Sequence, residues 1–271
     1  MKQKKSWLNG KTIVITGVTG GLGKALTKEL IFRYGANIIG VARNKEKMDN
    51  FLSELNSQNF TPFLFDVSKN ANFEDFSAKI AQNLLKIDIL INNAGVMPAF
   101  KRFENHTAEE IENVISTNLF SSMHATRNLL GLLKQSPTPA IVNIASACAF
   151  AAVIGTSAYS ASKAALKAFT DTLREENKNI YVAGVYPGFI KTELFREKQL
   201  TGRIEKFASS PEKIAKQICK KLHKKRKHIT VGFDGKLLRT FSRLLPNKIT
   251  PIMTSVLTRS GEENFKGLKD E

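Results

Sequence analysis

Short apolar runs alternate along most of the chain with segments in which apolar residues recur every three to four positions. The runs are rich in β-branched residues, as in Lys11-Thr-Ile-Val-Ile-Thr16, which is typical of buried strands. The longer segments have the period of helices that bury one face. The pattern predicts strands at about 12–16, 37–42, 60–65, 87–91, 139–145, 180–186 and 228–232. It predicts helices at about 22–34, 45–57, 71–85, 108–134, 157–177 and 211–225.

The strands and helices alternate without a linker, so we expect an α/β fold with a doubly wound parallel sheet of about seven strands. Nearly continuous apolar strands such as 87–91 suit a parallel sheet that helices cover on both faces. Residues 1–232 then form one domain. Residues 233–271 form a C-terminal extension, in which 235–246 and 249–257 have the pattern of short amphipathic helices. Ligands of such sheets bind at the carboxyl ends of the strands.

The first predicted strand leads directly into Gly17-Val-Thr-Gly20-Gly21-Leu-Gly23, and a helix follows. Glycines let the backbone approach a pyrophosphate, and the helix N-terminus supplies N–H groups and a positive dipole. The simpler interpretation is an ordinary tight turn between strand and helix. The strand before the loop and the helix after it favour a dinucleotide-binding loop.

Tyr159 and Lys163 are four residues apart, so on a helix they lie on one face. A free tyrosine loses its proton near pH ~10, and a neighbouring ammonium group is expected to lower that pKa. Ser146, at the end of a predicted strand, could hold a substrate oxygen beside the phenol. These three residues suit proton transfer to a carbonyl or from an alcohol. On its own, the Tyr-x-x-x-Lys spacing more often marks a solvated helix face.

The order and spacing of several motifs resemble the classical short-chain dehydrogenases/reductases. The resemblance covers about residues 8 to 230, and its motifs are Thr16-Gly17-x-x-x-Gly21-Leu-Gly23, Asp66-Val67, Asn92-Asn93-Ala94-Gly95, Asn118, Ser146, Tyr159-x-x-x-Lys163 and Pro187-Gly188-x-x-x-Thr192. Each motif is weak alone, and agreement of the whole set by chance is remote. The resemblance implies a Rossmann-like fold and an oxidoreductase that transfers a hydride between a nicotinamide cofactor and a carbonyl or alcohol.

The resemblance also implies roles for single residues. Asn118, Ser146, Tyr159 and Lys163 would be catalytic, with Tyr159 as the general acid or base and Asn118 holding a water that joins Lys163 to solvent. The cofactor would be bound by Gly17, Thr19, Gly20, Gly21, Leu22, Gly23, Arg43, Asp66, Val67, Asn93, Ala94, Gly95, Tyr159, Lys163, Pro187, Gly188 and Thr192. Thr192 would bind the nicotinamide carboxamide. No metal is expected.

The end of the second strand bears on the choice of cofactor. Ala42 and Arg43 stand where a carboxylate would bind the ribose hydroxyls of NAD(H), and a guanidinium group suits the 2′-phosphate of NADP(H). We therefore favour NADP(H). An NAD(H)-dependent alcohol dehydrogenase and a non-catalytic homologue that senses the cofactor stay as alternatives. The intact Ser146, Tyr159 and Lys163 set argues against the sensor.

The segments predicted to line the substrate site are mostly apolar and favour a hydrophobic carbonyl or alcohol. They are Met97-Pro-Ala-Phe100, Cys148-Ala-Phe150, Val153-Ile154, Phe189 and Leu194-Phe195. Residues 189–210 are expected to close over the substrate. Core packing is the simpler interpretation for any one of these side chains.

The net charge of +17 is unusually high, and residues 213–248 hold twelve Lys and Arg against one acid. A solvated basic helix end is the simpler account of this charge. With the amphipathic segments beyond it, the region could also bind an anionic membrane surface or pair subunits. No nucleic-acid-binding motif accompanies it, so a nucleic-acid partner is not expected. Relatives commonly form dimers or tetramers through the helices predicted at 108–134 and 157–177.

The sequence has two cysteines, so we expect no disulfide. It shows no signal peptide and no apolar run of ~20 residues, which predicts a cytoplasmic protein. A peripheral membrane location is the alternative.

Overall fold

A parallel sheet with strand order β3-β2-β1-β4-β5-β6-β7 runs through the centre of the molecule. The computed structural model describes residues 6–83, 86–192, 208–259, 265 and 268. The strands are β1 (Thr12–Thr16), β2 (Asn37–Ala42), β3 (Phe60–Leu64), β4 (Ile89–Asn92), β5 (Ala140–Ile144), β6 (Tyr181–Pro187) and β7 (His228–Val231). Every neighbouring pair is parallel, so the expected sheet is confirmed. The order reverses between β1 and β4, where doubly wound sheets bind their ligands.

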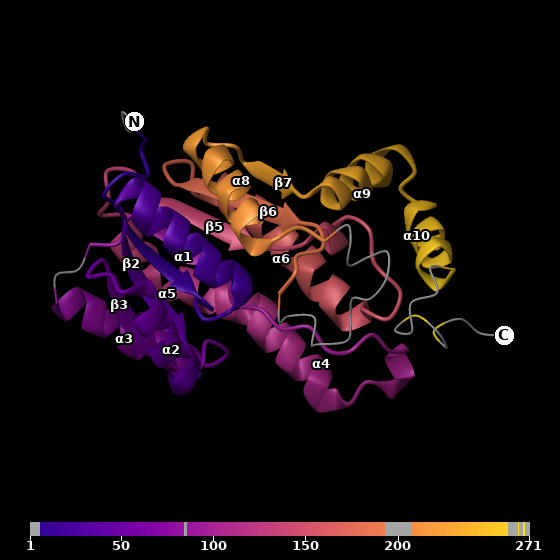
Figure 1. Ribbon diagram of the computed structural model, residues 1–271, viewed down its shortest axis with the longest axis horizontal. Coiled ribbons are helices and arrows are strands. Elements are labelled where there is room, and N and C mark those ends of the chain that lie inside the picture. The colour runs from indigo at the N-terminus through magenta and orange to yellow at the C-terminus, as the bar shows by residue number, and fades with distance from the viewer. Residues whose placement is uncertain (1–5, 84–85, 193–207, 260–264, 266–267, 269–271) are drawn as a thin grey trace.

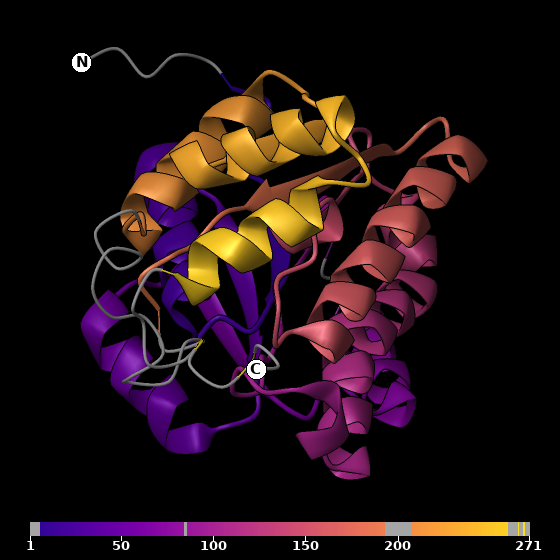
Figure 2. The same ribbon diagram turned by 90° about the vertical axis from the view of Figure 1, so that its right-hand side faces the viewer.

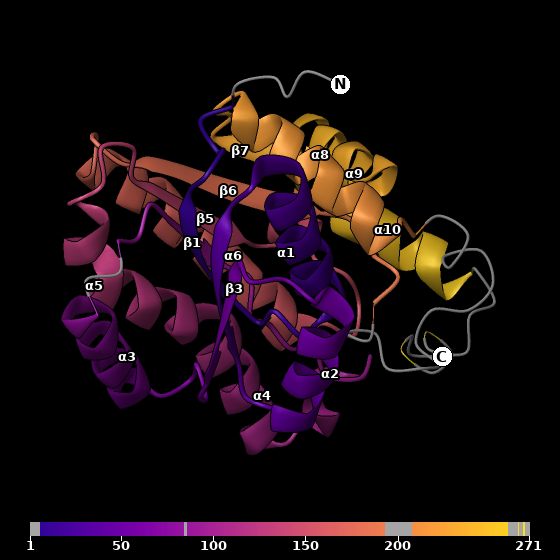
Figure 3. The same ribbon diagram turned by 60° about the vertical axis from the view of Figure 1, so that its left-hand side comes forward.

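Helices cover both faces of the sheet (Figures 1 and 3). One face carries α1 (Gly21–Tyr34), α2 (Lys45–Leu55) and α8 (Pro211–His223). The other carries α3 (Asn70–Gln82), α5 (Ser121–Leu133) and α6 (Ser157–Glu176). Because strand side chains alternate, Ile13 and Ile15 pack with the first set of helices and Val14 with the second. Proline is found at the edge of sheets, and Pro62 lies in the edge strand β3.

The helix predicted over 108–134 is not continuous. Thr107 and Glu110 form a capping box that begins α4 (Ala108–Ile115), a π turn follows at Ser116–Phe120, and α5 continues the chain. The N–H of Ser121 donates to the carbonyl oxygen of Ser116, five residues earlier. Within this turn, the buried Asn118 hydrogen-bonds to the backbone of Val96 instead of continuing the regular helix face. The other predicted helices and all the strands lie within three residues of their expected bounds. Two short 3₁₀ turns that were not predicted lie at Phe103–Asn105 (η1) and Ala147–Ala149 (η3).

The C-terminal segment forms the two amphipathic helices expected from its pattern, α9 (Phe233–Leu244) and α10 (Ile249–Thr258). They lie together beyond β7 at one side of the molecule, as Figure 2 shows. Leu238 and Ile249 pack on Ala147 and Ala151, in the segment that follows β5. The extension therefore covers part of the carboxyl edge of the sheet. Division of the chain at residue 232 stays a prediction.

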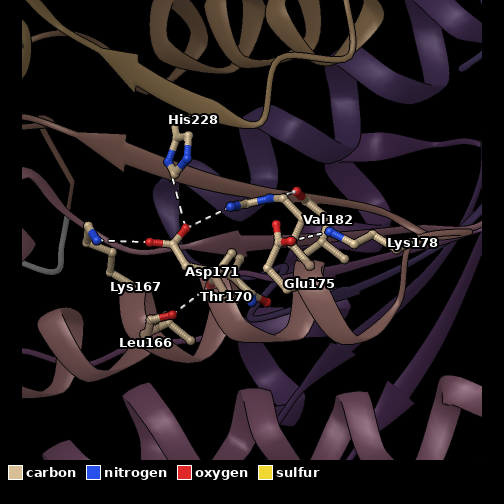
Figure 4. Close-up of polar contacts among 10 residues, drawn as sticks. Leu166, Lys167, Thr170, Asp171, Glu175, Lys178, Val182 and His228 are labelled. Atoms are coloured by element: carbon tan, nitrogen blue, oxygen red, sulfur yellow. Dashed lines mark hydrogen bonds and ion pairs between the residues drawn. The ribbon is translucent and has the colours of Figure 1, made fainter.

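A polar cluster fastens the C-terminal half of α6 to β6 and β7 (Figure 4). The carboxylate of Asp171 accepts hydrogen bonds from Lys167 at 2.9 Å and from Arg174 at 2.8 Å, and the Nδ1 atom of His228 lies 3.9 Å from it. The buried Arg174 also donates to the carbonyl oxygen of Val182 at 2.8 Å. The cluster holds one end of the helix that carries Tyr159 and Lys163 at the other.

No helix in the described part of the chain is both long enough and apolar enough to cross a membrane.

Candidate active site

The carboxyl ends of β1, β2, β4, β5 and β6 open into one pocket of about 650 Å³. The predicted site residues that line it are Gly17, Thr19, Gly20, Gly21, Leu22, Gly23, Arg43, Asp66, Val67, Asn93, Ala94, Gly95, Ser146, Tyr159, Lys163, Pro187, Gly188 and Thr192. Asn118 is the one predicted site residue that does not line it. The structure thus brings together residues from seven separate parts of the sequence, as convergence at the strand ends predicts.

Two glycines of the first loop stand where no larger residue fits. A Cβ atom on Gly23 would lie 2.2 Å from the carbonyl oxygen of Gly17. Gly17 has a φ of +71°, and a Cβ atom there would lie 2.8 Å from the Cα atom of Ala94. Helix α1 begins immediately after this loop, at Gly21, with no side-chain cap and no acidic residue in its first turn. Its N-terminal N–H groups and positive dipole therefore suit the phosphates of a dinucleotide.

Asn92 and Asn93 tie strands together beneath this loop. The side-chain amide of Asn93 donates to the carbonyl oxygens of Thr16 at 2.9 Å and Gly17 at 3.1 Å, and the Thr16 hydroxyl accepts from the N–H of Asn93 at 3.0 Å. The amide of Asn92 donates to Asn143 on β5 at 2.8 Å. The turn therefore joins β4 to both of its neighbours, β1 and β5.

The end of the pocket beside β2 carries a positive charge. Arg43 is exposed and follows β2, and Lys47 in the first turns of α2 lines the same end. Sequence reasoning missed Lys47, although it lies four residues after Arg43 in the segment predicted as a helix. The carboxylate of Asp66 accepts a hydrogen bond from the N–H of Ser68 at 2.9 Å, so it caps the turn after β3 as well as lining the pocket.

Ser146, Tyr159 and Lys163 form one buried group in the wall of the pocket. The hydroxyl of Ser146 accepts a hydrogen bond from the N–H of Cys148 at 3.2 Å, and Ser146 and Tyr159 both line the pocket. The Nζ atom of Lys163 lies 5.7 Å from the centre of the Tyr159 ring and donates to the carbonyl oxygen of Ile144 at 3.1 Å. The predicted shared helix face is therefore confirmed, and it faces the end of β5.

Burial dominates the titration of this group. It raises the pKa of Tyr159 above the ordinary tyrosine value, an effect that Cys148 strengthens and the Ser146 hydrogen bond opposes. Burial lowers the pKa of Lys163 to about 8. The pKa of Tyr159 is thus raised in this structure, and not lowered as expected, because burial disfavours the charged phenolate. Tyr159 holds its proton at neutral pH, as a general acid must.

Asn118 lies behind the pocket wall. Its amide donates to the carbonyl oxygen of Val96 and to the hydroxyl of Ser162, both at 3.0 Å, and its carbonyl oxygen accepts from the N–H of Val96 at 2.8 Å. Gly95 separates it from Lys163: a Cβ atom on Gly95 would lie 3.3 Å from the Asn118 oxygen and 3.4 Å from the Lys163 nitrogen. Asn118 therefore fixes the backbone beside Lys163, and the relay through a water stays a prediction.

Asp234, at the start of α9, is a pocket residue that sequence reasoning missed. Its Oδ2 atom accepts a hydrogen bond from the N–H of Phe189 at 2.6 Å. A Cβ atom on Gly188 would lie within 2.1 and 2.2 Å of its two carboxylate oxygens. Burial raises its pKa. Its position in the sequence could have indicated this role, because Asp234 follows the seventh predicted strand at the edge of the sheet where the site was expected.

Thr192 and the expected substrate segments are only partly gathered in the pocket. The Thr192 side chain lies over the glycine loop, since a Cβ atom on Gly21 would lie 2.7 Å from its Cγ2 atom. The candidate substrate residues that line the pocket are Met97, Pro98, Ala99, Phe100, Cys148, Val153 and Phe189. Phe150 packs instead on Tyr186, with ring centres 4.6 Å apart, and it lines a neighbouring hollow with Ile154. Leu194 and Phe195 lie outside the described residues, as does most of the segment expected to close over the substrate.

Both cysteines are free thiols, as expected. Among the described residues, no cluster of three or more His, Cys, Asp or Glu side chains could hold a metal ion.

Known proteins resemble this chain in sequence and in fold. The sequence model described as "short chain dehydrogenase" matches residues 11–202. The dehydrogenase/reductase SDR family protein 7-like of Drosophila melanogaster is 30% identical over 246 residues, which cover 84% of this chain and 74% of that protein. The NADPH-dependent pterin aldehyde reductase of Arabidopsis thaliana is 33% identical over 186 residues, 68% of this chain and 76% of that protein.

A solved alcohol dehydrogenase from the archaeon Thermococcus sibiricus, complexed with 5-hydroxy-NADP, superposes with a TM-score of 0.73 at 26% identity. The superposition covers 82% of this chain and 96% of that one. The family match spans more than half of the chain and includes the glycine loop, Ser146, Tyr159 and Lys163. The chain therefore belongs to the short-chain dehydrogenase/reductase family of oxidoreductases.

Proposed function

We propose that this oxidoreductase uses NADP(H) to interconvert a carbonyl and an alcohol on a hydrophobic substrate, with Tyr159 as the general acid or base. The observation that carries the proposal is that the buried Ser146, Tyr159 and Lys163 line the same pocket as the glycine loop. When bound there, the nicotinamide supplies or accepts the hydride.

The protein residues manage the substrate oxygen and its proton. Ser146 binds the carbonyl oxygen through its hydroxyl group. Tyr159, which burial keeps protonated, donates its proton to that oxygen in the reductive direction and recovers it in the oxidative direction. Lys163 lies close enough to supply positive charge when the phenolate forms. Asn118 holds the Val96 backbone in place and, in our proposal, a water that connects Lys163 to solvent.

The preference for NADP(H) is supported by charge at the end of β2. Arg43 and Lys47 line the pocket there. The chain has Ala42 at the end of β2 and Arg43 directly after it, so neither position supplies a carboxylate that would bind the ribose hydroxyls or repel a 2′-phosphate. The Arabidopsis pterin aldehyde reductase is NADPH-dependent, and the Thermococcus enzyme was solved with an NADP derivative. An NAD(H)-dependent alcohol dehydrogenase is the alternative.

The substrate proposal rests on the apolar side chains of Met97, Phe100, Val153 and Phe189 in the pocket. The relatives act on chemically different compounds, so they support the reaction type and not one substrate. Association into a homodimer or homotetramer is also proposed, and the exposed Phe120 and Met123 beside α5 would suit such an interface. Peripheral binding to an anionic membrane is proposed as well. Nucleic acid is not a proposed partner.

The Tyr159→Phe variant tests the catalytic assignment. Removing the acidic hydroxyl should lower NADPH-dependent reduction of apolar ketones and aldehydes by about a thousandfold. NADPH binding, measured by fluorescence titration, should change little because the ring remains. Tyr34→Phe on α1, outside the pocket, is the matched control and should turn over normally. Appreciable turnover by Tyr159→Phe would contradict the mechanism. A wild-type protein that binds NADPH but reduces no substrate would instead favour a non-catalytic homologue that senses the cofactor.

The Arg43→Ala variant tests the cofactor assignment. Loss of the guanidinium group should weaken NADPH binding about tenfold and leave NADH binding nearly unchanged, since only NADPH carries the 2′-phosphate. Lys45→Ala is the control, because Lys45 is an exposed neighbour that pairs with Asp49 at 2.6 Å and does not line the pocket. Equal affinities of the wild type for NADH and NADPH would overturn the preference.

A further inference from the structure

Helix α9 exposes a row of large apolar side chains on one face. Phe233, Leu237, Phe241 and Leu244 recur every three to four residues, and Phe233 and Leu244 are 71% and 69% exposed. Leu238 and Gly235 are buried on the opposite side. A stable helix in water normally directs such a row into the core, so this one is available for a partner.

Helix α10 and the turn before it add further exposed apolar groups. Ile252 and Val256 are exposed one turn apart, and Leu245 is exposed at the end of α9. The two helices contact each other and stand together at one side of the molecule (Figures 1 and 2). We call these exposed apolar residues of α9, α10 and their connection the C-terminal apolar surface.

Basic residues surround this surface. Lys236, Arg243, Lys248 and Arg259 are exposed on or beside the two helices. A second exposed group follows α8: Lys224, Lys225, Arg226 and Lys227. Lys221 of α8 is affected by residues of both groups, since burial first, and then repulsion from Lys236, Arg239 and Arg226, lowers its pKa. Crowding of like charges costs stability, and an anionic partner would relieve it.

We propose that the C-terminal apolar surface and its surrounding lysines and arginines bind the surface of an anionic lipid bilayer, with α9 and α10 lying in the interface. Apolar side chains would enter the boundary between headgroups and acyl chains while the cations contact the headgroups. This attachment is peripheral, since no described helix could span a bilayer. The proposal does not depend on the reaction that the enzyme catalyses.

Charge decides between a membrane and a second copy of the chain. A symmetric dimer through α9 would bring two basic surfaces face to face, which costs energy by repulsion. An anionic bilayer meets the same cations with opposite charge. The row of Phe and Leu side chains also distinguishes this surface from a basic patch that binds nucleic acid through phosphates alone.

Docking would place the membrane beside the active site. The inner face of α9 lines the pocket with Asp234 and Leu238, while its outer face carries Phe233 and Leu237. Thr250 and Thr254 of α10 line the neighbouring hollow, which shares Cys148 and Val153 with the pocket. An apolar substrate dissolved in the bilayer would therefore be close to the pocket wall.

Vesicle flotation of the full chain tests the proposal. The wild type should float with phosphatidylcholine vesicles that contain about one third phosphatidylserine, stay unbound with pure phosphatidylcholine, and dissociate as salt rises. The double variant Phe233→Ser with Leu244→Ser should bind at least tenfold more weakly. Lys236→Glu with Arg243→Glu should also lose at least tenfold.

Two controls match these variants. Phe32→Ser with Leu64→Ser removes exposed apolar side chains from α1 and β3, and Lys69→Glu with Lys134→Glu makes the same change in net charge elsewhere. Both should float like the wild type. All substitutions are at exposed positions, and circular dichroism would verify that each variant is folded.

Three results would overturn the proposal. The wild type could fail to float with anionic vesicles, or the controls could lose binding as much as the test variants. Light scattering could instead find an oligomer that Phe233→Ser with Leu244→Ser dissociates, without any vesicle binding, which would identify a second copy as the partner.

Discussion

Asp234 connects the C-terminal extension to the turn that closes the pocket. Its carboxylate holds the N–H of Phe189, and Gly188 has room for it only because it lacks a Cβ atom. The contact spans 45 residues of sequence. We infer that Asp234 is a positioning residue that fixes the shape of the Pro187-Gly188 turn, where the cofactor is proposed to bind.

Variants at Asp234 separate this role from simple packing. Asp234→Ala should weaken NADPH binding and raise its KM about tenfold, with a smaller effect on kcat, because the turn loses a hydrogen bond to a charged acceptor. Asp234→Asn keeps an acceptor oxygen and should recover most of the affinity. Fluorescence titration and steady-state kinetics measure both. Wild-type affinity in Asp234→Ala, or no recovery in Asp234→Asn, would contradict the positioning role.

Single residues were predictable where spacing alone sets their place. Tyr159 and Lys163 follow from one helical turn, and the glycines follow from the loop between a strand and a helix. Lys47 and Asp234 were missed because their place in the pocket depends on how α2 and α9 approach the sheet. The direction of the Tyr159 pKa shift was also missed, since burial is its largest cause and burial is a property of the folded molecule.

Regular elements were predictable to within a few residues, apart from the π turn at 116–120. The apolar period continues through this stretch, and Asn118, a mediocre helix former, is a weak local sign of the break. Its cause is the pair of hydrogen bonds between Asn118 and the backbone of Val96, 22 residues earlier. Contacts of this kind act between elements, and sequence periodicity describes only one element at a time.

The Asp171 cluster gives α6 a stability that depends on pH. Burial alone would raise the pKa of Asp171, but hydrogen bonds from Lys167 and Arg174 outweigh it and the pKa is lowered. The unfolded pKa is about 3.9. The stabilisation is therefore complete above that value and is lost as the pH falls through the lower, folded-state pKa.

Asp171→Asn should accordingly lower the free energy of unfolding by about 1–2 kcal/mol at pH 7, a modest figure because the carboxylate is partly exposed to solvent. The difference from the wild type should shrink below about pH 4. Urea unfolding at both pH values measures it, and Asp75→Asn on the exposed side of α3 is the control. A difference that persists unchanged in acid would show that the carboxylate charge is not the cause.

At the scale of the molecule, alternation of strands and helices indicated the sheet, and the motifs indicated the edge where the site lies. The strand order β3-β2-β1-β4-β5-β6-β7 follows from the family resemblance and from the handedness of crossover connections, not from the pattern of any one strand. The basic C-terminal segment was visible in the sequence as charge. The sequence did not show which side of α9 is exposed and apolar and which side is buried toward the pocket, because this depends on how the helix packs.

The π turn also affects how this chain is compared with others. Its hydrogen bond spans five residues instead of the four of an α-helix, so the turn holds one residue more than a regular turn. An ungapped alignment with a protein whose corresponding helix is unbroken would match either α4 or α5, but not both. One gap within 116–120 would bring both flanks into register, and the residue beside that gap would be the asparagine of the proposed proton relay.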